Sequence, residues 1–155
     1  MNIDGKAVAQ ELRQSLAIEV KQLQDERGIT PGLTVILVGE DPASQVYVRN
    51  KVRQTQEVGM ISNEIRMPAD TSQDALLAEL DKLNNDPAVH GILVQLPLPK
   101  HIDETLIIDT ILPEKDVDGF HPMNSGRLAN GDDAALVPCT PQGCVILAKK
   151  HLGDN

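Results

Sequence analysis

The chain has 155 residues, of which 41% are hydrophobic and 24% are charged, and its formal net charge at pH 7 is -9. This mixture is typical of a globular protein, and the length suits one domain with a real core rather than two full-sized domains. The negative charge argues against a broad surface that follows phosphates, so nucleic acid is not an expected partner.

The first predicted elements are a long helix and a buried strand. Apolar side chains spaced three to four residues apart predict a helix over residues 4–27, capped at its end by Gly28. We expect its apolar stripe to be buried; the stripe consists of Val8, Leu12, Leu16, Val20 and Leu23. The β-branched run LTVILVG at 33–39 then predicts a strand buried on both faces.

A second helix and a second strand follow directly. Asp41 or Ser44 can cap the start of the helix, and Gly59 is expected to end it. The segment ISNEIRMP at 61–68 places Ile61, Ile65 and Met67 on one side and predicts a strand that is less buried than the first.

The next pair is a helix and a strand of the same kind. Thr71 and Asp74 have the spacing of a capping box before a helix that carries four inward-facing leucines, at 76, 77, 80 and 83. The run HGILVQLPLP at 90–99 predicts a third strand, which Pro97 and Pro99 must end because proline has no N–H to donate.

Alternating strands and helices predict an open, mostly parallel sheet in a three-layer α/β/α arrangement. In such sheets ligands bind beyond the carboxyl ends of the strands. We therefore expect three polar segments to lie near one another, at 39–51, 95–99 and 114–122.

The last part of the chain is expected to leave this domain. Residues 119–140 are rich in Gly, Pro and Asn and predict a connection to a final helix beginning near Pro141, which carries the apolar cluster Val145, Ile146 and Leu147. Cys139 and Cys144 are too few for a disulfide framework, so we interpret them as free thiols in a reducing compartment. The four histidines show no metal-ligand spacing, and no apolar run suits a signal peptide or a membrane span. We expect a cytoplasmic protein without a metal.

Four polar residues stand out as candidates for chemistry. Tyr47 and Lys51 lie four apart on a predicted helix, so both should project from one face. A structural role is the commoner explanation for such a pair, and the Tyr-x-x-x-Lys pair of short-chain dehydrogenases is rejected because no glycine-rich dinucleotide motif precedes Tyr47. Gln95 at a strand end and Asp118 before a glycine would each, taken singly, be explained by ordinary strand-end and turn roles.

Taken together, these residues stand in motifs that resemble one family over essentially the whole chain. VGEDPASQVYVRNK, GILVQLPLP, PEKDVDGFHPMNSGRL and PCTPQG occur in the order and spacing of the bifunctional methylenetetrahydrofolate dehydrogenase/cyclohydrolase family. The resemblance implies one-carbon metabolism: oxidation of methylenetetrahydrofolate to methenyltetrahydrofolate with NADP, or NAD in some members, and hydrolysis of that cation to formyltetrahydrofolate. It also implies that the intact enzyme is a homodimer.

The resemblance implies a role for each candidate. Lys51 is the central catalytic residue, Tyr47 packs on the folate rings, Gln95 holds the lysine and Asp118 hydrogen-bonds the pterin. Further walls of the same cleft are expected at Ser44, Val94, Leu96, Pro97, Pro138 and Thr140. The chemistry agrees, because hydrolysis of an iminium-like carbon needs a group that handles a proton. The nearby cations Arg49 and Arg53 are expected to favour the neutral amine of Lys51.

The resemblance further divides the chain into a catalytic domain at 1–138 and a connecting segment with a helix at 139–155. A Rossmann-type domain that binds NADP is expected after this helix and is not contained in these 155 residues, which hold no cofactor-binding residues of their own. Two alternatives stay open: the chain alone binds folate without turning it over, or it is an inactive dimerisation module.

Overall fold

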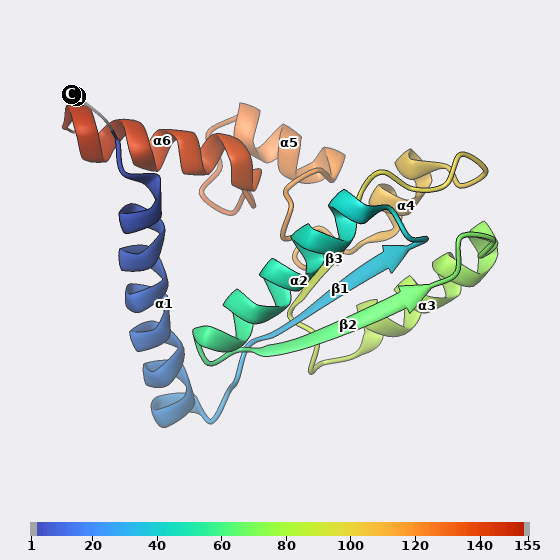
Figure 1. Cartoon of the computed structure of the whole chain (residues 1–155), viewed down its shortest axis with the longest axis horizontal. Coiled ribbons are helices and arrows are strands. Elements are labelled where there is room, and N and C mark those ends of the chain that lie inside the picture. Colours follow the sequence, from blue (N-terminus) through green and yellow to red (C-terminus); the bar gives the residue numbers. More distant parts are fainter. Residues whose placement is uncertain (1–2, 154–155) are drawn as a thin grey trace.

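The computed structural model describes residues 3–153, which form six helices and three strands (Figure 1). In chain order they are α1 (Gly5–Arg27), β1 (Gly32–Val38), α2 (Pro42–Glu57), β2 (Ile61–Met67), α3 (Gln73–Asn85), β3 (Gly91–Val94), α4 (Glu104–Thr110), α5 (Pro122–Ala129) and α6 (Cys139–Leu152).

The three strands form one parallel sheet in the order β2-β1-β3. In the central strand β1, Gly32 pairs with Ile61 of β2, and Leu33 pairs with Gly91 of β3. β1 is buried along almost its whole length, whereas β2 alternates between exposed and partly buried residues, as expected for an edge strand. The predicted parallel α/β sheet is therefore confirmed.

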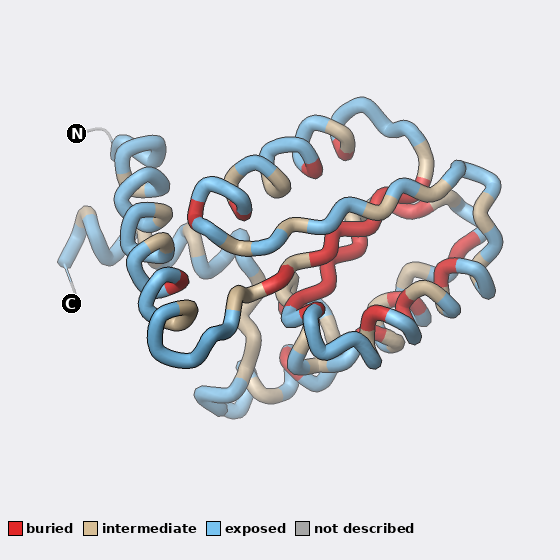
Figure 2. Tube along the Cα trace, turned by 90° about the horizontal axis from the view of Figure 1, so that it is seen from below, coloured by how far each residue is buried: buried red, intermediate tan, exposed pale blue. Residues whose placement is uncertain are grey.

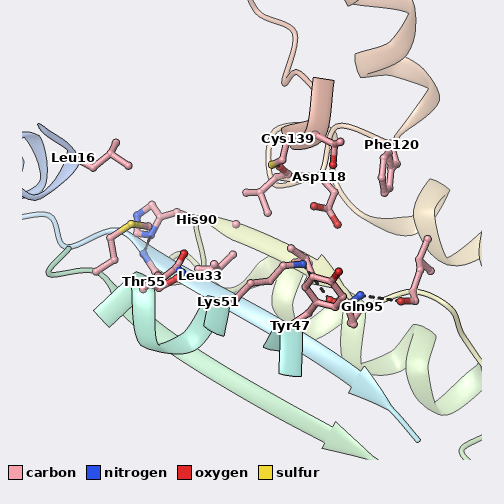
Figure 3. A pocket seen from close by; sticks show the side chains of 18 residues that line it. Leu16, Leu33, Tyr47, Lys51, Thr55, His90, Gln95, Asp118, Phe120 and Cys139 are labelled. Carbon is pink, nitrogen blue, oxygen red and sulfur yellow. Dashed lines mark hydrogen bonds between the residues drawn. The ribbon is translucent and has the colours of Figure 1, made fainter. Parts of the chain in front are cut away.

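Helices cover both faces of this sheet and give the predicted three layers (Figures 1 and 2). On the face that α2 covers, the buried cluster is small: Val35, Leu37, Val48 and Leu93. Leu33 and Leu93 also line a pocket on this side of the sheet (Figure 3). This face is therefore only partly closed by its helix.

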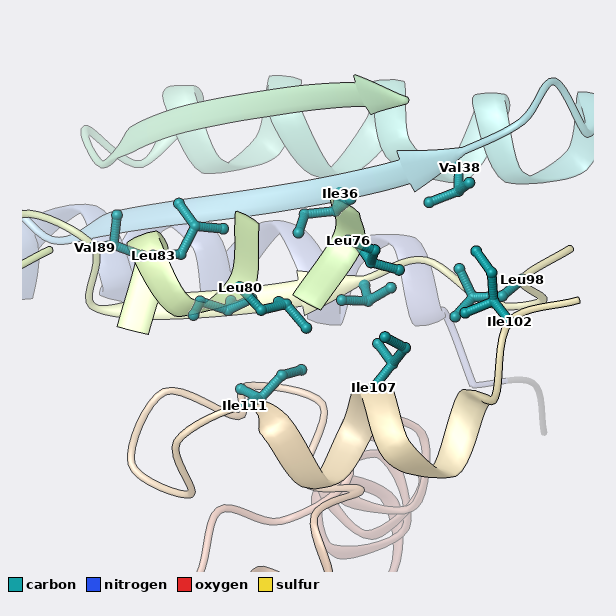
Figure 4. Packing of buried hydrophobic residues seen from close by; sticks show 12 residues of the cluster. Ile36, Val38, Leu76, Leu80, Leu83, Val89, Leu98, Ile102, Ile107 and Ile111 are labelled. Carbon is teal, nitrogen blue, oxygen red and sulfur yellow. The ribbon is translucent and has the colours of Figure 1, made fainter. Parts of the chain in front are cut away.

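The larger core lies on the opposite face, between the sheet and the helices α3 and α4 (Figure 4). Ile36 of β1 and Ile92 of β3 meet Leu76 and Leu80 of α3 there, and Ile107 of α4 closes the cluster; all five are 0% exposed. Burial of such side chains is the dominant favourable term in folding. This face therefore anchors the sheet whose other face carries the pocket.

Side-chain caps fix where several helices begin. Asp41 accepts a hydrogen bond from the Ser44 N–H at 2.7 Å and so starts α2, in agreement with the sequence. The predicted cap of α3 is wrong by one residue, because Ser72 rather than Thr71 accepts from the Ala75 N–H, at 3.2 Å.

The predicted burial of the α1 stripe is largely wrong. The helix forms as expected and ends at Gly28, whose φ of 66° suits glycine. Its side chains, however, meet the rest of the chain mainly at one end, where Val20 is buried, while Leu12 and Leu16 are exposed. The spacing of apolar residues predicted the helix, but it could not show whether another element packs against the apolar face. Figure 2 shows α1 as exposed along most of its length.

The segment at 119–140 is not simply a connection, because it contains α5. His121 caps this helix by accepting the Met123 N–H at 3.0 Å, and Pro122 opens it. A short helix of mixed composition gives a weak periodic signal, which explains why α4 and α5 were both missed. The final helix begins at Cys139, with Pro138 as its cap, two residues before the expected Pro141. No helix within residues 3–153 is long and apolar enough to cross a membrane.

Candidate functional site

A cavity of about 960 Å³ lies between α2, the sheet, the loop at 117–120 and the start of α6 (Figure 3). The chain contains one tyrosine, one phenylalanine and no tryptophan, and both aromatic residues line this cavity. Tyr47 is 62% exposed and Phe120 is 49% exposed. Neither ring is used in the core, so both are free to contact a flat ligand.

One face of α2 supplies a stripe of side chains to the cavity. Tyr47, Lys51 and Thr55 are spaced four residues apart along the helix, and all three line the cavity. Arg49 and Arg53 lie two residues to either side of Lys51, which places them on the other side of the helix, where both are exposed. Arg53 pairs with Glu57 at 3.6 Å. The expectation that these arginines act on Lys51 is therefore not supported.

Lys51 and Gln95 form the one direct contact across the cavity that the sequence predicted. The Lys51 Nζ donates to the Gln95 Oε1 at 3.1 Å, while the Gln95 Nε2 donates to the carbonyl of Leu96 at 2.8 Å (Figure 3). Gln95 itself is held because its backbone N–H donates to the Ile36 carbonyl at 2.9 Å, extending the β1 ladder. The amide is thus fixed with its oxygen toward the lysine.

Asp118 faces the same cavity from the loop between α4 and α5, which pairs with β3 at Asp116. Desolvation raises the pKa of its carboxyl group; the nearby charge of Lys51 lowers it, and that of Asp116 raises it further. Asp118 is partly buried and lines the cavity. The three predicted polar segments therefore do meet at one place.

Six of the ten predicted site residues line the cavity: Tyr47, Lys51, Gln95, Leu96, Asp118 and Thr140. The other four are not among the residues that line it. Ser44 is buried in the first turn of α2, and Val94 faces the core on the α3 side. Pro97 is exposed after a cis Leu96–Pro97 peptide bond, and Pro138 precedes α6. Strand alternation gives the reason for Val94, since Leu93, its neighbour, points to the cavity side instead.

The cavity also contains residues that the sequence did not single out. Phe120 and Cys139 lie near Asp118, and His90 lies at the far end with Leu16 and Leu33 (Figure 3). The signal for Phe120 was available, since it is the only phenylalanine and stands two residues after Asp118. Desolvation and the Asp118 carboxylate raise the pKa of the Cys139 thiol, whose Sγ donates to the Val117 carbonyl at 3.4 Å. Both Cys139 and Cys144 are free and exposed.

The ionisable groups of the cavity do not form a metal centre. Among residues 3–153, no three His, Cys, Asp or Glu side chains come together in a way that could hold a metal ion. Lys51 is the only lysine or arginine among the residues that line the cavity. The site can therefore offer a flat polar ligand two aromatic rings, one amine and one carboxylate.

Comparison with known proteins identifies the family. The model of the tetrahydrofolate dehydrogenase/cyclohydrolase catalytic domain matches residues 3–118. "Bifunctional protein FolD 2" of Roseobacter denitrificans is 60% identical over 98% of this chain, and "Bifunctional protein FolD" of Rhodopseudomonas palustris is 61% identical over 96% of it. In both cases the match spans 50% of the relative, so the chain spans about half the length of the curated relatives it matches.

Solved structures agree with this result. The FolD methylenetetrahydrofolate dehydrogenase/cyclohydrolase of Campylobacter jejuni is 44% identical, with a TM-score of 0.94 over 98% of this chain and 54% of that one. The corresponding Trypanosoma brucei enzyme, solved with NADP cofactor and an inhibitor, is 38% identical, with a TM-score of 0.93 over 97% of this chain and 52% of that one. The chain therefore belongs to the tetrahydrofolate dehydrogenase/cyclohydrolase family, whose catalytic domain it matches.

Proposed function

We propose that the cavity binds tetrahydrofolate derivatives and that Lys51 is the proton-handling residue for hydrolysis of methenyltetrahydrofolate to formyltetrahydrofolate. The observation that carries the proposal is the 3.1 Å hydrogen bond from Lys51 to Gln95 inside a cavity that also holds Asp118 and both aromatic residues. The dehydrogenase reaction would use the same cavity, with methylenetetrahydrofolate as the bound folate that is oxidised.

Hydrolysis adds water to a carbon that sits between two nitrogens and shares their positive charge. The Lys51 amine would take a proton from the attacking water as the carbon–oxygen bond forms. It would then return a proton to one nitrogen as the carbon–nitrogen bond breaks. The added hydroxyl group would lose its proton to solvent and become the carbonyl oxygen of the formyl group on the other nitrogen, so that one proton is released overall. Gln95 suits this role because its amide oxygen accepts an N–H of the amine and adds no negative charge.

Asp118 and the aromatic residues would bind and orient the pterin. The pterin edge presents a ring N–H and an amino group side by side, and a carboxylate can accept from both. Tyr47 and Phe120 offer flat faces at the mouth of the same cavity. A folate placed this way would bring its one-carbon bridge toward Lys51.

The dehydrogenase reaction needs a hydride acceptor, and we propose NADP. Within residues 3–153, the cavity lining includes one lysine and no glycine-rich turn at the start of a helix, so we propose that the phosphates of the dinucleotide bind outside this cavity. The proposed division at residue 138 coincides with the start of α6, which supports reading 139–155 as a connecting segment. Homodimerisation and a cytoplasmic location also belong to this proposal, and the free thiols of Cys139 and Cys144 support a reducing compartment.

The test is the decay of methenyltetrahydrofolate absorbance in the presence of the purified 155-residue chain. We expect decay faster than in buffer, and we expect Lys51→Met to lower the enzymatic rate by about 100-fold or more, because general acid–base catalysis contributes at least that much. The methionine keeps the length of the aliphatic stem, so folate binding should be retained.

Lys100→Met is the matched control, because Lys100 is exposed and does not line the cavity. Decay no faster than buffer with the unmodified chain would favour a folate-binding module without turnover. Unchanged hydrolysis in Lys51→Met would show that the lysine is not the catalytic group.

A further inference from the structure

Two polar side chains are almost completely buried beside the cavity without lining it. Asp116 is 2% exposed and Asn124 is 0% exposed, although the surrounding loops are largely open to solvent. The Asn124 Nδ2 donates to the Asp116 Oδ2 at 2.9 Å, and the His121 N–H donates to the same oxygen at 2.9 Å. Buried polar groups of this kind are retained only when they are hydrogen-bonded.

Asn124 uses its whole amide to join three parts of the chain. Besides its bond to Asp116, its Nδ2 donates to the carbonyl of Pro113 at 2.8 Å, and its Oδ1 accepts from the Leu136 N–H at 3.4 Å. The first contact holds the turn after α4, and the last holds the segment that leads into α6. An amide has two donors and an acceptor, so no other side chain of similar size could make all three contacts.

The segments that Asn124 joins form one wall of the cavity together, and the face of α2 that carries Tyr47 and Lys51 lies opposite them (Figure 3). The loop 116–121 bears Asp118 and Phe120, and the segment 136–140 bears Cys139 and Thr140. They touch at Gly119, where a Cβ would lie 2.6 Å from the Leu136 carbonyl oxygen and 2.7 Å from the Pro138 nitrogen. The loop is also anchored to β3, because the Ile92 N–H donates to the Lys115 carbonyl at 2.7 Å.

We infer that Asn124, through its hydrogen bonds to Asp116 and Leu136, is a positioning residue that holds the Asp118 loop against the start of α6, so that this wall of the cavity keeps the shape a ligand needs. It touches neither the cavity nor, in the proposed binding mode, the folate. The inference rests on the proposed function for its effect on binding, but its effect on geometry can be measured without a ligand.

The experiment compares Asn124→Ala with the unmodified chain by two readouts. The first is the rate of alkylation of Cys139 by N-ethylmaleimide, divided by that of Cys144, which lies on the same helix and outside the cavity lining. Loss of Asn124 should free the loop that accepts the Cys139 thiol hydrogen bond and raise this ratio severalfold. The second is the dissociation constant for 5-formyltetrahydrofolate, which should rise about tenfold if the displaced loop costs one hydrogen bond between Asp118 and the ligand.

Two further variants make the result specific. Asp116→Asn can keep an oxygen where both donors point, so it should retain the ratio and the affinity of the unmodified chain. Asn130→Ala removes an exposed asparagine at the end of α5 and should change neither. A general loss of stability would speed the alkylation of Cys139 and Cys144 alike. The positioning role requires instead that Asn124→Ala speeds the alkylation of Cys139 more than that of Cys144.

The inference is overturned if folded Asn124→Ala keeps both the alkylation ratio and the affinity. It is also overturned if Asp116→Asn raises the ratio as far as Asn124→Ala, since charge rather than geometry would then set the loop. If Asn124→Ala does not fold, Asn124→Ser is used, and an unchanged ratio in that variant has the same meaning. If the unmodified chain does not bind 5-formyltetrahydrofolate, the proposed function fails for this chain, and the alkylation ratio alone decides the inference.

Discussion

Asp118 illustrates a conflict between stability and binding at the scale of one residue. Its carboxyl group faces the cavity, where desolvation raises its pKa. A raised pKa means that the folded chain binds a proton more readily than the unfolded chain, so ionisation of Asp118 costs folding free energy. In the proposed binding mode the same ionised carboxylate would pair with the pterin edge.

Asp118→Asn should therefore stabilise the free chain and weaken folate binding. An amide carries no charge to desolvate, but it cannot accept two hydrogen bonds from the pterin edge as a carboxylate does. We expect the dissociation constant for 5-formyltetrahydrofolate to rise about tenfold to 100-fold, the range for hydrogen bonds to charged groups. Calorimetry measures both effects, and an unchanged dissociation constant would remove Asp118 from the ligand site.

The pH dependence of that stability difference has a definite sign. Below the ordinary aspartate pKa of 3.8 the carboxyl group is neutral in the folded and unfolded chains, so the two proteins should be equally stable there as far as this residue is concerned. As the pH rises through the raised pKa, the unmodified chain loses stability relative to Asp118→Asn. Urea melts across pH 4 to 8 would contradict this if the gap between the proteins stayed constant.

At the scale of secondary-structure elements, Lys115 joins the C-terminal end of α3 to the loop that carries Asp118. Its Nζ donates to three carbonyls at that end, those of Leu83 at 2.9 Å, Asn84 at 2.8 Å and Asp86 at 2.8 Å. The last carbonyls of a helix have no partners within it, and a cation there also meets the negative end of the helix dipole. The Lys115 side chain thus supplies hydrogen-bond donors to the C-terminal carbonyls of a helix that ends 30 residues earlier in the chain.

Lys115→Met should lower the free energy of unfolding by about 2 kcal/mol, the scale of hydrogen bonds from a charged group at a helix end. Lys82→Met is the control, because Lys82 lies in the same helix, pairs with Glu79 and is 70% exposed. Such exposed pairs contribute less than about 1 kcal/mol. Chemical denaturation of both variants would contradict the role of Lys115 if their stabilities fell by the same amount.

The sequence predicted the elements whose signals are local. The strand β1 is a continuous apolar run, and α1 and α2 carry periodic side chains with recognisable caps at Gly28 and Asp41. The cap at Ser72 was missed because its neighbour Thr71 offered an equally good local pattern, and α4 and α5 were missed because helices this short give a weak periodic signal.

The contacts of the candidate site divide in the same way. The stripe on α2 follows from helical spacing, and the approach of the segments that carry Lys51 and Gln95 follows from the rule for parallel sheets, whereas the contact between these two residues was implied by the family resemblance. The roles of Lys115 and Asn124 join residues that only tertiary packing brings together, so no spacing in the sequence could indicate them. Val94 was wrongly predicted to line the cleft. In a run of apolar residues the sequence does not indicate which face of the strand meets the ligand and which meets the core.

For the whole molecule, burial is uneven. The core between the sheet and α3 is dense, whereas α1 has one buried residue and α6 has none (Figures 2 and 4). Val145 of α6 is 51% exposed, and Lys150 of the same helix pairs with Glu11 of α1. An isolated helix of 14 residues is marginal in water, so α6 needs contacts with the rest of the chain to be stable. Because none of its residues is buried, these contacts are few.

Hydrogen exchange should therefore show a gradient across the molecule. Amides at 144–150 of α6 should be the least protected of any helix longer than 12 residues, and those of α3, which contributes three buried leucines, should be among the most protected. The measurement needs a dilute sample shown to be monomeric, because self-association could cover α6. Equal protection in α6 and α2 in such a sample would contradict this account of where stability resides.

The stripe on α2 has a consequence for which changes of length the protein can tolerate. Tyr47, Lys51 and Thr55 share one phase of the helix, and that phase is set by Asp41, which follows β1 after only two residues. Each added or deleted residue in this turn would rotate the helix by about 100° relative to the strand, provided that the helix kept its position. All three side chains would then leave the cavity together. Point substitutions can alter these residues one at a time, but an insertion at 39–41 would remove them as a group.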